Sequence, residues 1–293
     1  MDFLRMLSEI RQPFWDTLFQ YITIMAQEVF VIVVLCWFYW CHDKILAYSL
    51  GFTYFLSGLL VQGLKLTFRI PRPWILDPDF EPVASAVPAA TGYSFPSGHT
   101  QSGTALFSTL GFNSKHKIWK CICFFFMLMI GFSRMYLGVH TPKDVLTALI
   151  LTFVISYVIH KYLKKDLEKP EKAKFFGLLL FIICVLMFVY TCFFYFTQTE
   201  DQYMAKSAFK ACGAGFGFAL GYYLERTKIQ FTPPTTIKEK VLRFVIGLVS
   251  VVILMLFFEL TLDKFLVRKI ISYFILVLWI VAIYPAIFTR WKK

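Results

Sequence analysis

The sequence is poor in charged residues and contains a single asparagine. Only 16% of its 293 residues are Asp, Glu, Lys or Arg, whereas about 25% is usual for soluble domains. Hydrophobic residues make up 58% of the chain and aromatic residues 19%, which excludes an ordinary soluble domain. The one asparagine, Asn113, is followed by Ser-Lys, so the sequence lacks an acceptor for N-glycosylation. That absence favours a bacterial plasma membrane.

The cysteines offer neither a disulfide framework nor a zinc site. The seven cysteines lie within or at the ends of apolar segments, and none is in a predicted outer loop. Cys121 and Cys123 lack the spacing and partner ligands of zinc. A carboxylate cluster for Mg²⁺ is also missing. We therefore expect neither a metal nor another cofactor.

Long apolar segments recur along the whole chain. Windows of about twenty residues with few charges are long enough to cross a bilayer as helices. These windows are 22–41, 45–67, 99–113, 118–138, 142–162, 175–197, 204–225, 241–261 and 269–289. The sequence thus predicts an all-α fold, a polytopic membrane bundle of about nine transmembrane helices. The window 99–113 is short and carries several Ser and Thr residues.

The net charge of +12 does not indicate a nucleic-acid-binding protein, because the basic residues form no single tract or patch. They fall between the apolar segments instead. If the loop 41–44 faces the cytoplasm, 18 of the 30 Lys and Arg residues lie on that side. By the positive-inside rule, we predict an integral membrane protein with an outside N-terminus and a cytoplasmic C-terminus.

The chain divides into three predicted parts. Residues 1–21 form an interfacial N-terminal segment, expected to be an amphipathic helix and not a cleaved signal. Its expected lipid-facing residues are Phe3, Leu4, Leu7, Phe14 and Leu18. Residues 22–163 form the catalytic core with five spans, and 164–293 an additional C-terminal membrane bundle with four. Within that bundle, glycines at 213, 215, 217 and 221 have the spacing of close helix packing.

A first polar cluster combines Lys65 with Arg72 and Pro73. Lys65 and Arg72 are seven residues apart, about two helical turns, and the neighbouring prolines predict a helix end. Arg supplies paired donors and Lys a point charge, as phosphate binding requires. For Lys65 alone, a lysine that reaches the interface from a helix end is an equal alternative.

A second cluster, Pro96-Ser97-Gly98-His99, comes directly before an apolar run. It predicts a helix start, whose exposed amides and positive dipole end attract anions. Ser97 can cap the helix or donate to a phosphate oxygen. His99 is close enough in sequence to protonate a leaving oxygen beside that phosphate.

A third cluster runs from Ser133-Arg134 through His140 to Asp144. Thr141 fits the N-cap of a helix, Pro142 its first position and Asp144 its third. A carboxylate there points back toward His140 and could accept one imidazole N–H, which would leave the other nitrogen nucleophilic. The alternative is a plain capping box with an incidental histidine.

The three clusters together resemble the motifs of the type 2 phosphatidic acid phosphatase superfamily, which includes glucose-6-phosphatase and the vanadium haloperoxidases. The resemblance covers roughly residues 60–160, with all three motif spacings intact. It implies that His140 is the nucleophile, forming a phosphohistidine, that Asp144 orients it, and that His99 is the general acid and then the base. It also implies a phosphate site, without a metal, made by Lys65, Arg72, Ser97, Gly98 and Arg134.

The resulting hypothesis is a metal-independent membrane phosphatase acting at the extracytoplasmic face. Its expected substrate is a phosphorylated lipid such as undecaprenyl diphosphate, phosphatidic acid or phosphatidylglycerol phosphate. Nine spans would be similar to glucose-6-phosphatase, whereas many bacterial lipid phosphatases of the family have six. The alternatives are a lipid phosphotransferase, a sugar phosphatase and, outside enzymes, a lipid-binding or transport scaffold.

Overall fold

The computed structural model describes residues 1–199, 202–261 and 266–290, which form helices and connecting loops without a strand. The α-helices are α1 (Asp2–Glu9), α2 (Pro13–Ile24), α3 (Glu28–Trp37), α4 (Lys44–Phe68), α5 (Pro73–Leu76), α6 (Gly98–Asn113), α7 (Lys117–Tyr136), α8 (Pro142–Val158), α9 (Lys164–Leu167), α10 (Ala173–Thr197), α11 (Lys206–Leu224), α12 (Ile237–Thr261), α13 (Leu266–Leu278) and α14 (Tyr284–Arg290). Short π or 3₁₀ segments are η1 (Phe38–His42), η2 (Ala84–Ala86), η3 (Ile159–Leu163), η4 (Pro170–Lys172), η5 (Gln202–Ala205), η6 (Glu225–Ile229) and η7 (Trp279–Ile283). The predicted all-α class is confirmed.

The chain folds into two compact units. The first contains Met1–Ile32 and Leu56–His160, and the second Val33–Phe55 and Lys161–Lys293. All residues of the three polar clusters lie in the first unit. The three-part division at residues 21 and 163 stays a prediction.

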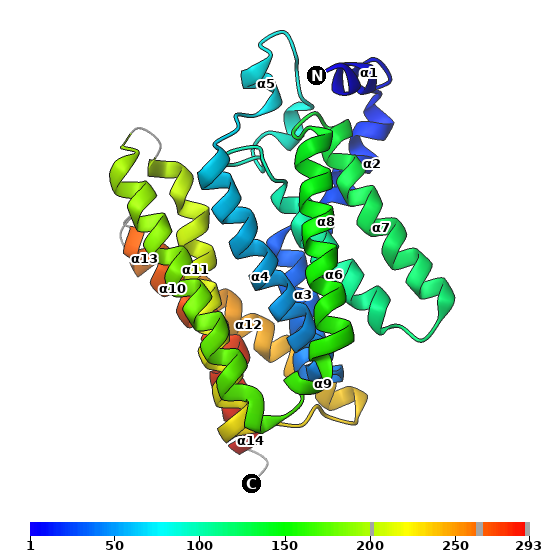
Figure 1. Cartoon of the computed structure of the whole chain (residues 1–293). Helices are drawn as coiled ribbons and strands as arrows, with labels where there is room; N and C mark the ends of the chain where they lie inside the picture. Colours follow the sequence, from blue (N-terminus) through cyan, green and yellow to red (C-terminus); the bar gives the residue numbers. More distant parts are fainter. Residues whose placement is uncertain (200–201, 262–265, 291–293) are drawn as a thin grey trace. The chain divides into compact units, whose positions relative to one another are not determined.

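In the first unit, α6 packs against both α7 and α8, and α2 lies along α7 (Figure 1). Helix α6 is largely buried, including its serines and threonines at 100, 102, 104, 108 and 109. Polar contacts satisfy part of this interior: Gln101 donates to Ser57 Oγ at 2.7 Å, and the hydroxyls of Thr109 and Ser156 lie 3.3 Å apart. The segment is therefore a central helix of the unit whose surroundings are protein.

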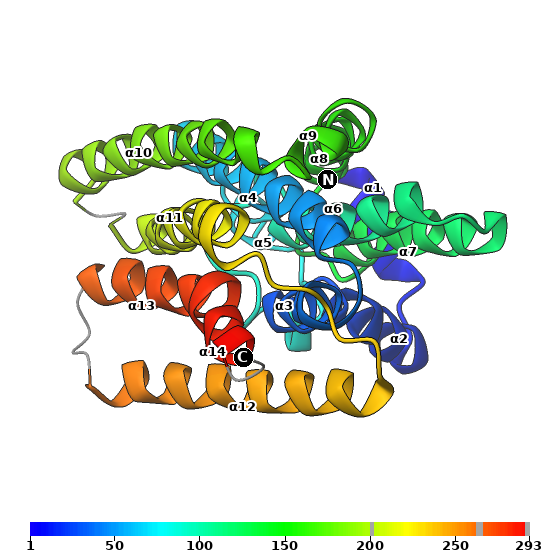
Figure 2. The same cartoon turned by 90° about the horizontal axis from the view of Figure 1, so that it is seen from below.

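In the second unit, α10, α11, α13 and α12 follow one another side by side (Figure 2). Helices α11 and α13 approach closely because α11 presents glycines. A Cβ on Gly213 or Gly217 would meet the backbone carbonyls of Ile270 and Phe274, and one on Gly221 would lie 2.8 Å from Cβ of Val281. The helix-packing interpretation of these three glycines is confirmed.

The predicted count of nine spans is too high by the test of helix length and apolarity. Six helices of the described chain pass it, or seven if the bent pair Pro13–Ile24 and Glu28–His42, with its 47° bend, is one span. Helices α6 and α11 form where predicted but do not meet the criteria of length and apolarity for a membrane span. Helix α6 has 16 residues, about 24 Å at 1.5 Å per residue, and protein covers much of both helices. Because neighbouring helices bury much of their surface, they accommodate Gly, Ser and Thr where a lipid-facing helix would be apolar.

The expected lipid-facing set of the N-terminal segment is partly wrong. Leu4 and Leu7 are buried, whereas Phe3, Phe14 and Leu18 are exposed. Helix α1 contacts α7, and Arg5 pairs with Asp77 at 2.6 Å. Its apolar face therefore packs partly on the protein.

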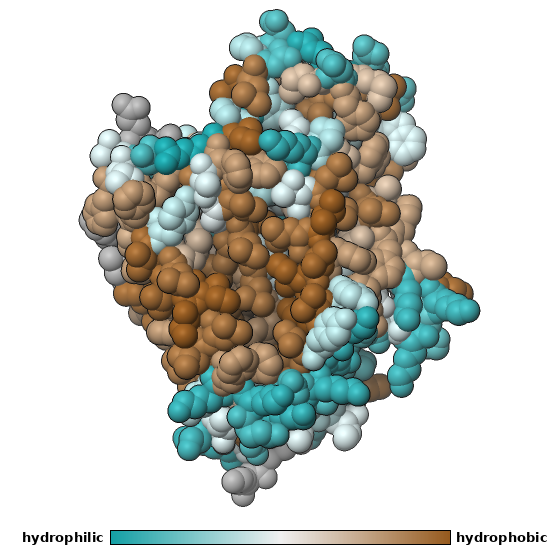
Figure 3. All heavy atoms as spheres, viewed as in Figure 1, coloured by the Kyte–Doolittle hydropathy of each residue, from teal (hydrophilic) through white to brown (hydrophobic). Residues whose placement is uncertain are grey.

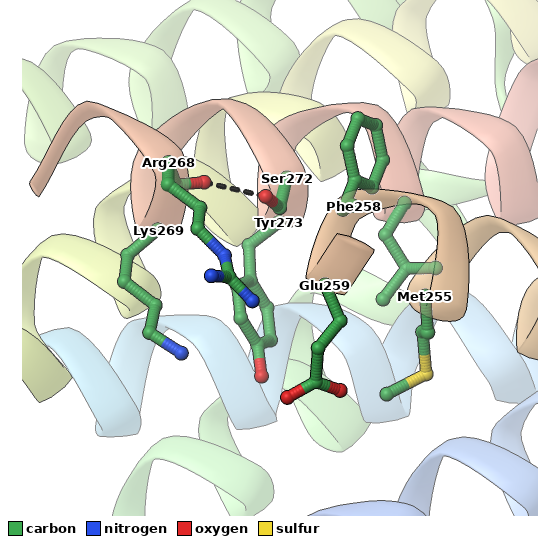
Figure 4. A pocket seen from close by; sticks show the side chains of 8 residues that line it. Met255, Phe258, Glu259, Arg268, Lys269, Ser272 and Tyr273 are labelled. Atoms are coloured by element: carbon green, nitrogen blue, oxygen red, sulfur yellow. Dashed lines mark hydrogen bonds between the residues drawn. The ribbon is translucent and has the colours of Figure 1, made fainter. Parts of the chain in front are cut away.

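Outside the polar clusters, the second unit contains a small cavity of about 100 Å³ between α12 and α13. Figure 4 shows Glu259 of α12 and Arg268, Lys269 and Tyr273 of α13 around it.

On α10, the exposed side chains include Phe175, Leu178 and Leu186. Hydrophobic residues cover this helix in Figure 3, with hydrophilic residues at its lower end. This surface is suited to lipid contact.

Candidate active site

Four helix ends of the first unit converge on the polar clusters. Lys65 lies near the end of α4, Ser97 caps the start of α6, Arg134 lies near the end of α7 and Asp144 in the first turn of α8. These four side chains and those of Arg72 and His140 are all buried. Gly98 and His99, the first two residues of α6, are partly exposed.

The start of α8 has the predicted capping box. Thr141 is the N-cap, Pro142 follows it, and the side chains of Thr141 and Asp144 each accept the other residue's backbone N–H. The bond from Thr141 N to Asp144 Oδ2 is 2.9 Å long. The same Oδ2 lies 3.3 Å from Nδ1 of His140. The local sequence therefore places the carboxylate beside the imidazole, as expected.

The start of α6 is fixed by its own cap and by α8. Ser97 Oγ accepts from the backbone N–H of Thr100 at 3.3 Å and from its hydroxyl at 2.9 Å, so Ser97 is an N-cap. Its backbone N–H donates to the carbonyl of Asp144 at 3.0 Å. At Gly98 an added Cβ would meet nothing within 4 Å. Open space therefore adjoins the first turn of α6, where helix amides can bind an anion.

Arg72 contacts the other nitrogen of His140. Its Nη1 lies 2.9 Å from Nε2 of the imidazole, and it also donates to the Val139 carbonyl at 3.0 Å. Since a guanidinium can only donate, Nε2 accepts and the imidazole proton is on Nδ1. That proton faces Asp144. The contacts thus define a neutral tautomer with its lone pair on Nε2.

His140 is buried among cations. Burial, followed by the charges of Arg72, Lys65 and Arg134 and by His99, lowers its pKa well below the ordinary value of 6.5. Each of these factors disfavours the imidazolium. The side chain is therefore neutral at neutral pH, and its Nε2 lone pair is free of a proton.

Two of the three guanidinium nitrogens of Arg134 have no hydrogen-bond partner. Its side chain is fully buried, and Nη1 donates to Thr23 Oγ1 of α2 at 3.1 Å. Its Nε and Nη2 have no hydrogen-bond partner. Buried, unsatisfied donors on a charged group are costly unless a ligand takes them. The arrangement is typical of a site that binds an anion.

A short turn brings Arg134 and His140 together. The Arg134 carbonyl accepts the backbone N–H groups of Val139 and His140 at 3.2 and 3.3 Å. Gly138 has a φ of 74°, a left-handed conformation that glycine adopts readily. The turn closes on itself and connects the end of α7 to the start of α8.

The segment 91–94, which belongs to none of the three clusters, accepts hydrogen bonds from both Lys65 and Arg72. The carbonyls of residues 91 and 92 accept hydrogen bonds from Arg72, at 2.7 Å from Nη2 and 3.0 Å from Nε. The carbonyls of residues 93 and 94 accept from Nζ of Lys65 at 2.5 and 3.4 Å. Ser94 Oγ also donates to Asp144 Oδ2 at 2.6 Å. The only signal in the sequence was the position of this segment directly before the second cluster. Thr23 was missed too, because nothing near it in the sequence indicates Arg134.

The described residues contain no group of three or more His, Cys, Asp or Glu side chains arranged to hold a metal ion. The expectation of metal-independent chemistry stays a prediction. What the site offers instead is three buried cations, a helix start and an imidazole with a free lone pair. These groups suit binding of a phosphate and nucleophilic attack on it.

Comparison with known proteins gives two family matches and several relatives. Undecaprenyl-diphosphatase BcrC of Bacillus subtilis is 31% identical over 116 residues, covering 39% of this chain and 56% of that protein. Sphingosine-1-phosphate phosphatase 2 of Homo sapiens is 26% identical over 272 residues, covering 83% of this chain and 64% of that protein. The crystal structure of Aquifex aeolicus LpxE matches with a TM-score of 0.48 and 26% identity, covering 55% of this chain and 94% of that one. The chain spans less than two thirds of the length of these two curated relatives.

The family matches cover most of the chain. Residues 46–168 match the PAP2 superfamily, and residues 209–293 match the transmembrane extension of PAP2 superfamily phosphatases. The first match contains all three polar clusters, and the second contains α12, α13 and most of α11. The chain therefore belongs to the PAP2 superfamily, the type 2 phosphatidic acid phosphatases and their relatives.

Proposed function

We propose that this protein is an integral-membrane phosphatase that hydrolyses a lipid phosphate or diphosphate through a phosphohistidine on His140. The observation that carries the proposal is the environment of His140: Nδ1 faces Asp144 and Nε2 faces Arg72. Membership of the PAP2 superfamily supports the reaction class. Two relatives are named as an undecaprenyl-diphosphatase and a sphingosine-1-phosphate phosphatase, which supports a lipid substrate.

In the proposed first step, the phosphoryl group binds among Lys65, Arg72, Arg134 and the first turn of α6. Nε2 of His140 attacks phosphorus, and the bond to the leaving oxygen breaks. His99, protonated once the bound phosphate offsets the charges of the cations around it, donates its proton to that oxygen, and the lipid alcohol or the shortened phosphate leaves with that proton. The Nδ1 proton stays hydrogen-bonded to Asp144, which stabilises the positive charge that develops on the imidazole.

In the second step, water takes the place of the leaving group. His99, now neutral, accepts a proton as the water oxygen attacks phosphorus and the P–N bond breaks. Inorganic phosphate leaves and His140 regains its lone pair. The same intermediate would serve a phosphotransferase if an alcohol replaced water, so the acceptor decides between the two activities.

The active site is proposed to face the extracytoplasmic side, with the C-terminus in the cytoplasm. The charge distribution supports this orientation, because 18 of the 30 Lys and Arg residues fall in the segments predicted to be cytoplasmic. The substrates considered are undecaprenyl diphosphate, phosphatidic acid and phosphatidylglycerol phosphate. A sphingoid-base phosphate is a further candidate substrate, because the human relative is named as a sphingosine-1-phosphate phosphatase.

The test is phosphate release by the purified protein in detergent with EDTA, against these lipids and a panel of sugar phosphates. We expect turnover of at least one lipid, its loss in His140→Ala, and unchanged rates in His116→Ala, an exposed histidine that precedes α7. Quenching with ³²P-labelled substrate should trap an acid-labile label on the wild type only. Activity that needs a divalent metal, or that survives loss of His140, would contradict the mechanism. Faster release from sugar phosphates would reassign the substrate, and binding without turnover would favour a scaffold.

A further inference from the structure

Ser94 lies at the contact between the carboxylate and the imidazole, although it belongs to none of the three clusters. Its side chain is fully buried. Its Oγ is 2.6 Å from Asp144 Oδ2 and 3.4 Å from His140 Nδ1. Because an ionised carboxylate only accepts, the serine hydroxyl donates its proton to Asp144. Its lone pairs remain available to the imidazole N–H.

The pairing of His140 and Asp144 is weak without a third group. The distance of 3.3 Å from Nδ1 to Oδ2 exceeds the usual range of about 2.7–3.2 Å for N–H···O bonds. The distance from Nδ1 to Ser94 Oγ is nearly the same. The two oxygens therefore share the Nδ1 proton, and together they hold it on that nitrogen.

Ser94 also limits rotation of the carboxylate. Oδ2 of Asp144 has one other fixed donor, the backbone N–H of Thr141 at 2.9 Å. Ser94 itself is held at both ends, since its N–H donates to the Ile70 carbonyl at 2.8 Å and its carbonyl accepts from Lys65. A rigid donor on a second side of the carboxylate keeps Oδ2 directed at the imidazole.

We propose that Ser94 is a positioning residue, which orients Asp144 and keeps the proton of His140 on Nδ1 so that Nε2 can attack phosphorus. This inference rests on the proposed function. No bond to Ser94 forms or breaks in the reaction; its hydroxyl proton remains hydrogen-bonded to the carboxylate throughout.

Removal of the hydroxyl has a predictable effect on acid–base behaviour. The charged and titratable groups around His140 are Asp144, Arg72, Lys65, Arg134 and His99. Without Ser94, the carboxylate can rotate away from His140, so that it stabilises an imidazolium less strongly. The acid limb of kcat/KM should then move to lower pH, a change that a packing defect alone would not cause.

The test compares Ser94→Ala, Ser94→Thr and a control, Ser108→Ala. Ser108 is a fully buried serine of α6 whose hydroxyl donates to the Thr104 carbonyl at 2.5 Å. We expect kcat to fall about 10- to 100-fold in Ser94→Ala, the size of a hydrogen bond to a charged group, with KM within about threefold. Ser94→Thr keeps a hydroxyl and should restore most of the rate, and Ser108→Ala should resemble the wild type. A normal rate and acid limb in folded Ser94→Ala would overturn the proposal.

A second measurement works even if no lipid is turned over. In ¹⁵N-histidine-labelled protein, the His140 signals, identified by their loss in His140→Ala, should report a proton fixed on Nδ1. They should shift toward an average of the two tautomers in Ser94→Ala, or in Ser94→Cys, a weaker donor, if the alanine variant does not fold. An unchanged tautomer would reject the role of Ser94, whereas absent turnover with a shifted tautomer would reject only the proposed function.

Discussion

Nη1 of Arg72 lies 2.9 Å from Nε2 of His140. The guanidinium therefore covers the lone pair that would attack phosphorus. A bound phosphate oxygen must replace Nε2 as the acceptor before the reaction can proceed. Arg72 also donates to the carbonyls of residues 91 and 92, bonds that it can keep while Nη1 exchanges its acceptor.

Arg72→Lys should reduce kcat/KM about 100- to 1,000-fold, the loss typical of a donor to a charged transition state. Lysine keeps the charge but cannot form the parallel bonds of a guanidinium. Steady-state phosphate release measures the effect. Arg69→Lys, at an exposed arginine in the same loop, is the control and should remain within about twofold of the wild type.

The acid limb of kcat/KM should lie below pH 6.5, because burial and the nearby cations lower the pKa of His140 from that value. A lower pKa keeps the imidazole deprotonated, and hence nucleophilic, to lower pH. Arg72→Gln removes the largest charge effect and should move the limb upward. Comparing both proteins on one substrate cancels the ionisation of the substrate itself. A downward move would contradict the assignment of the limb to His140.

Arg134→Met should abolish activity and raise thermal stability in phosphate-free detergent. The buried Nε and Nη2 lack partners, and unsatisfied donors cost about 1–3 kcal/mol each. Arg243→Met is the matched control: this buried arginine donates to the Thr232 carbonyl at 3.1 Å and lies over the Phe288 ring. We expect the control to lower the melting temperature.

Inorganic phosphate should raise the melting temperature of the wild type. A ligand at 100 times its Kd stabilises the folded state by about 2.7 kcal/mol. Arg134→Met should respond little, since it lacks the donors that remain free in the unliganded site. An equal shift in both proteins would indicate that phosphate binds elsewhere.

Gly217→Ala should destabilise the second unit by about 1–3 kcal/mol, the cost of overpacking. The new Cβ would collide with the Phe274 carbonyl oxygen, a backbone atom that cannot move away by a change of side-chain rotamer. Gly177→Ala, where the nearest atom is the Ala219 carbonyl at 3.2 Å, should cost less. Chemical denaturation in mild detergent distinguishes the two variants.

A cysteine introduced between residues 77 and 90 should react with an impermeant maleimide from outside intact cells. That outcome follows from the proposed orientation, in which this loop and the active site face the extracytoplasmic side. The parent needs Cys121 replaced, the exposed cysteine of the described chain. Labelling only after permeabilisation would reverse the topology.

The sequence predicted those parts of the site that depend on neighbouring residues. Thr141, Pro142 and Asp144 define a helix start by their own chemistry, so the carboxylate could be placed beside His140 in advance. Ser97 as a cap followed in the same way. Local rules of helix capping were sufficient for these contacts.

Contacts between distant segments could not be predicted. Ser94 and Asp144 are 50 residues apart, and Thr23 and Arg134 are 111 apart, so no spacing rule relates them. The surplus of predicted spans had a similar origin. Hydropathy cannot tell whether a helix such as α6 is surrounded by lipid or by other helices, and only the tertiary structure answers that question.

The bond from the backbone N–H of Ser97 to the backbone carbonyl of Asp144 has a consequence for which substitutions this chain can tolerate. It fixes the helix that carries His99 in register with the helix that follows His140, using main-chain atoms alone. Side-chain substitutions around the proposed phosphate site can therefore change its shape while the backbone alignment of the two histidines is kept. Proline at position 97 is the exception, because it has no N–H to donate.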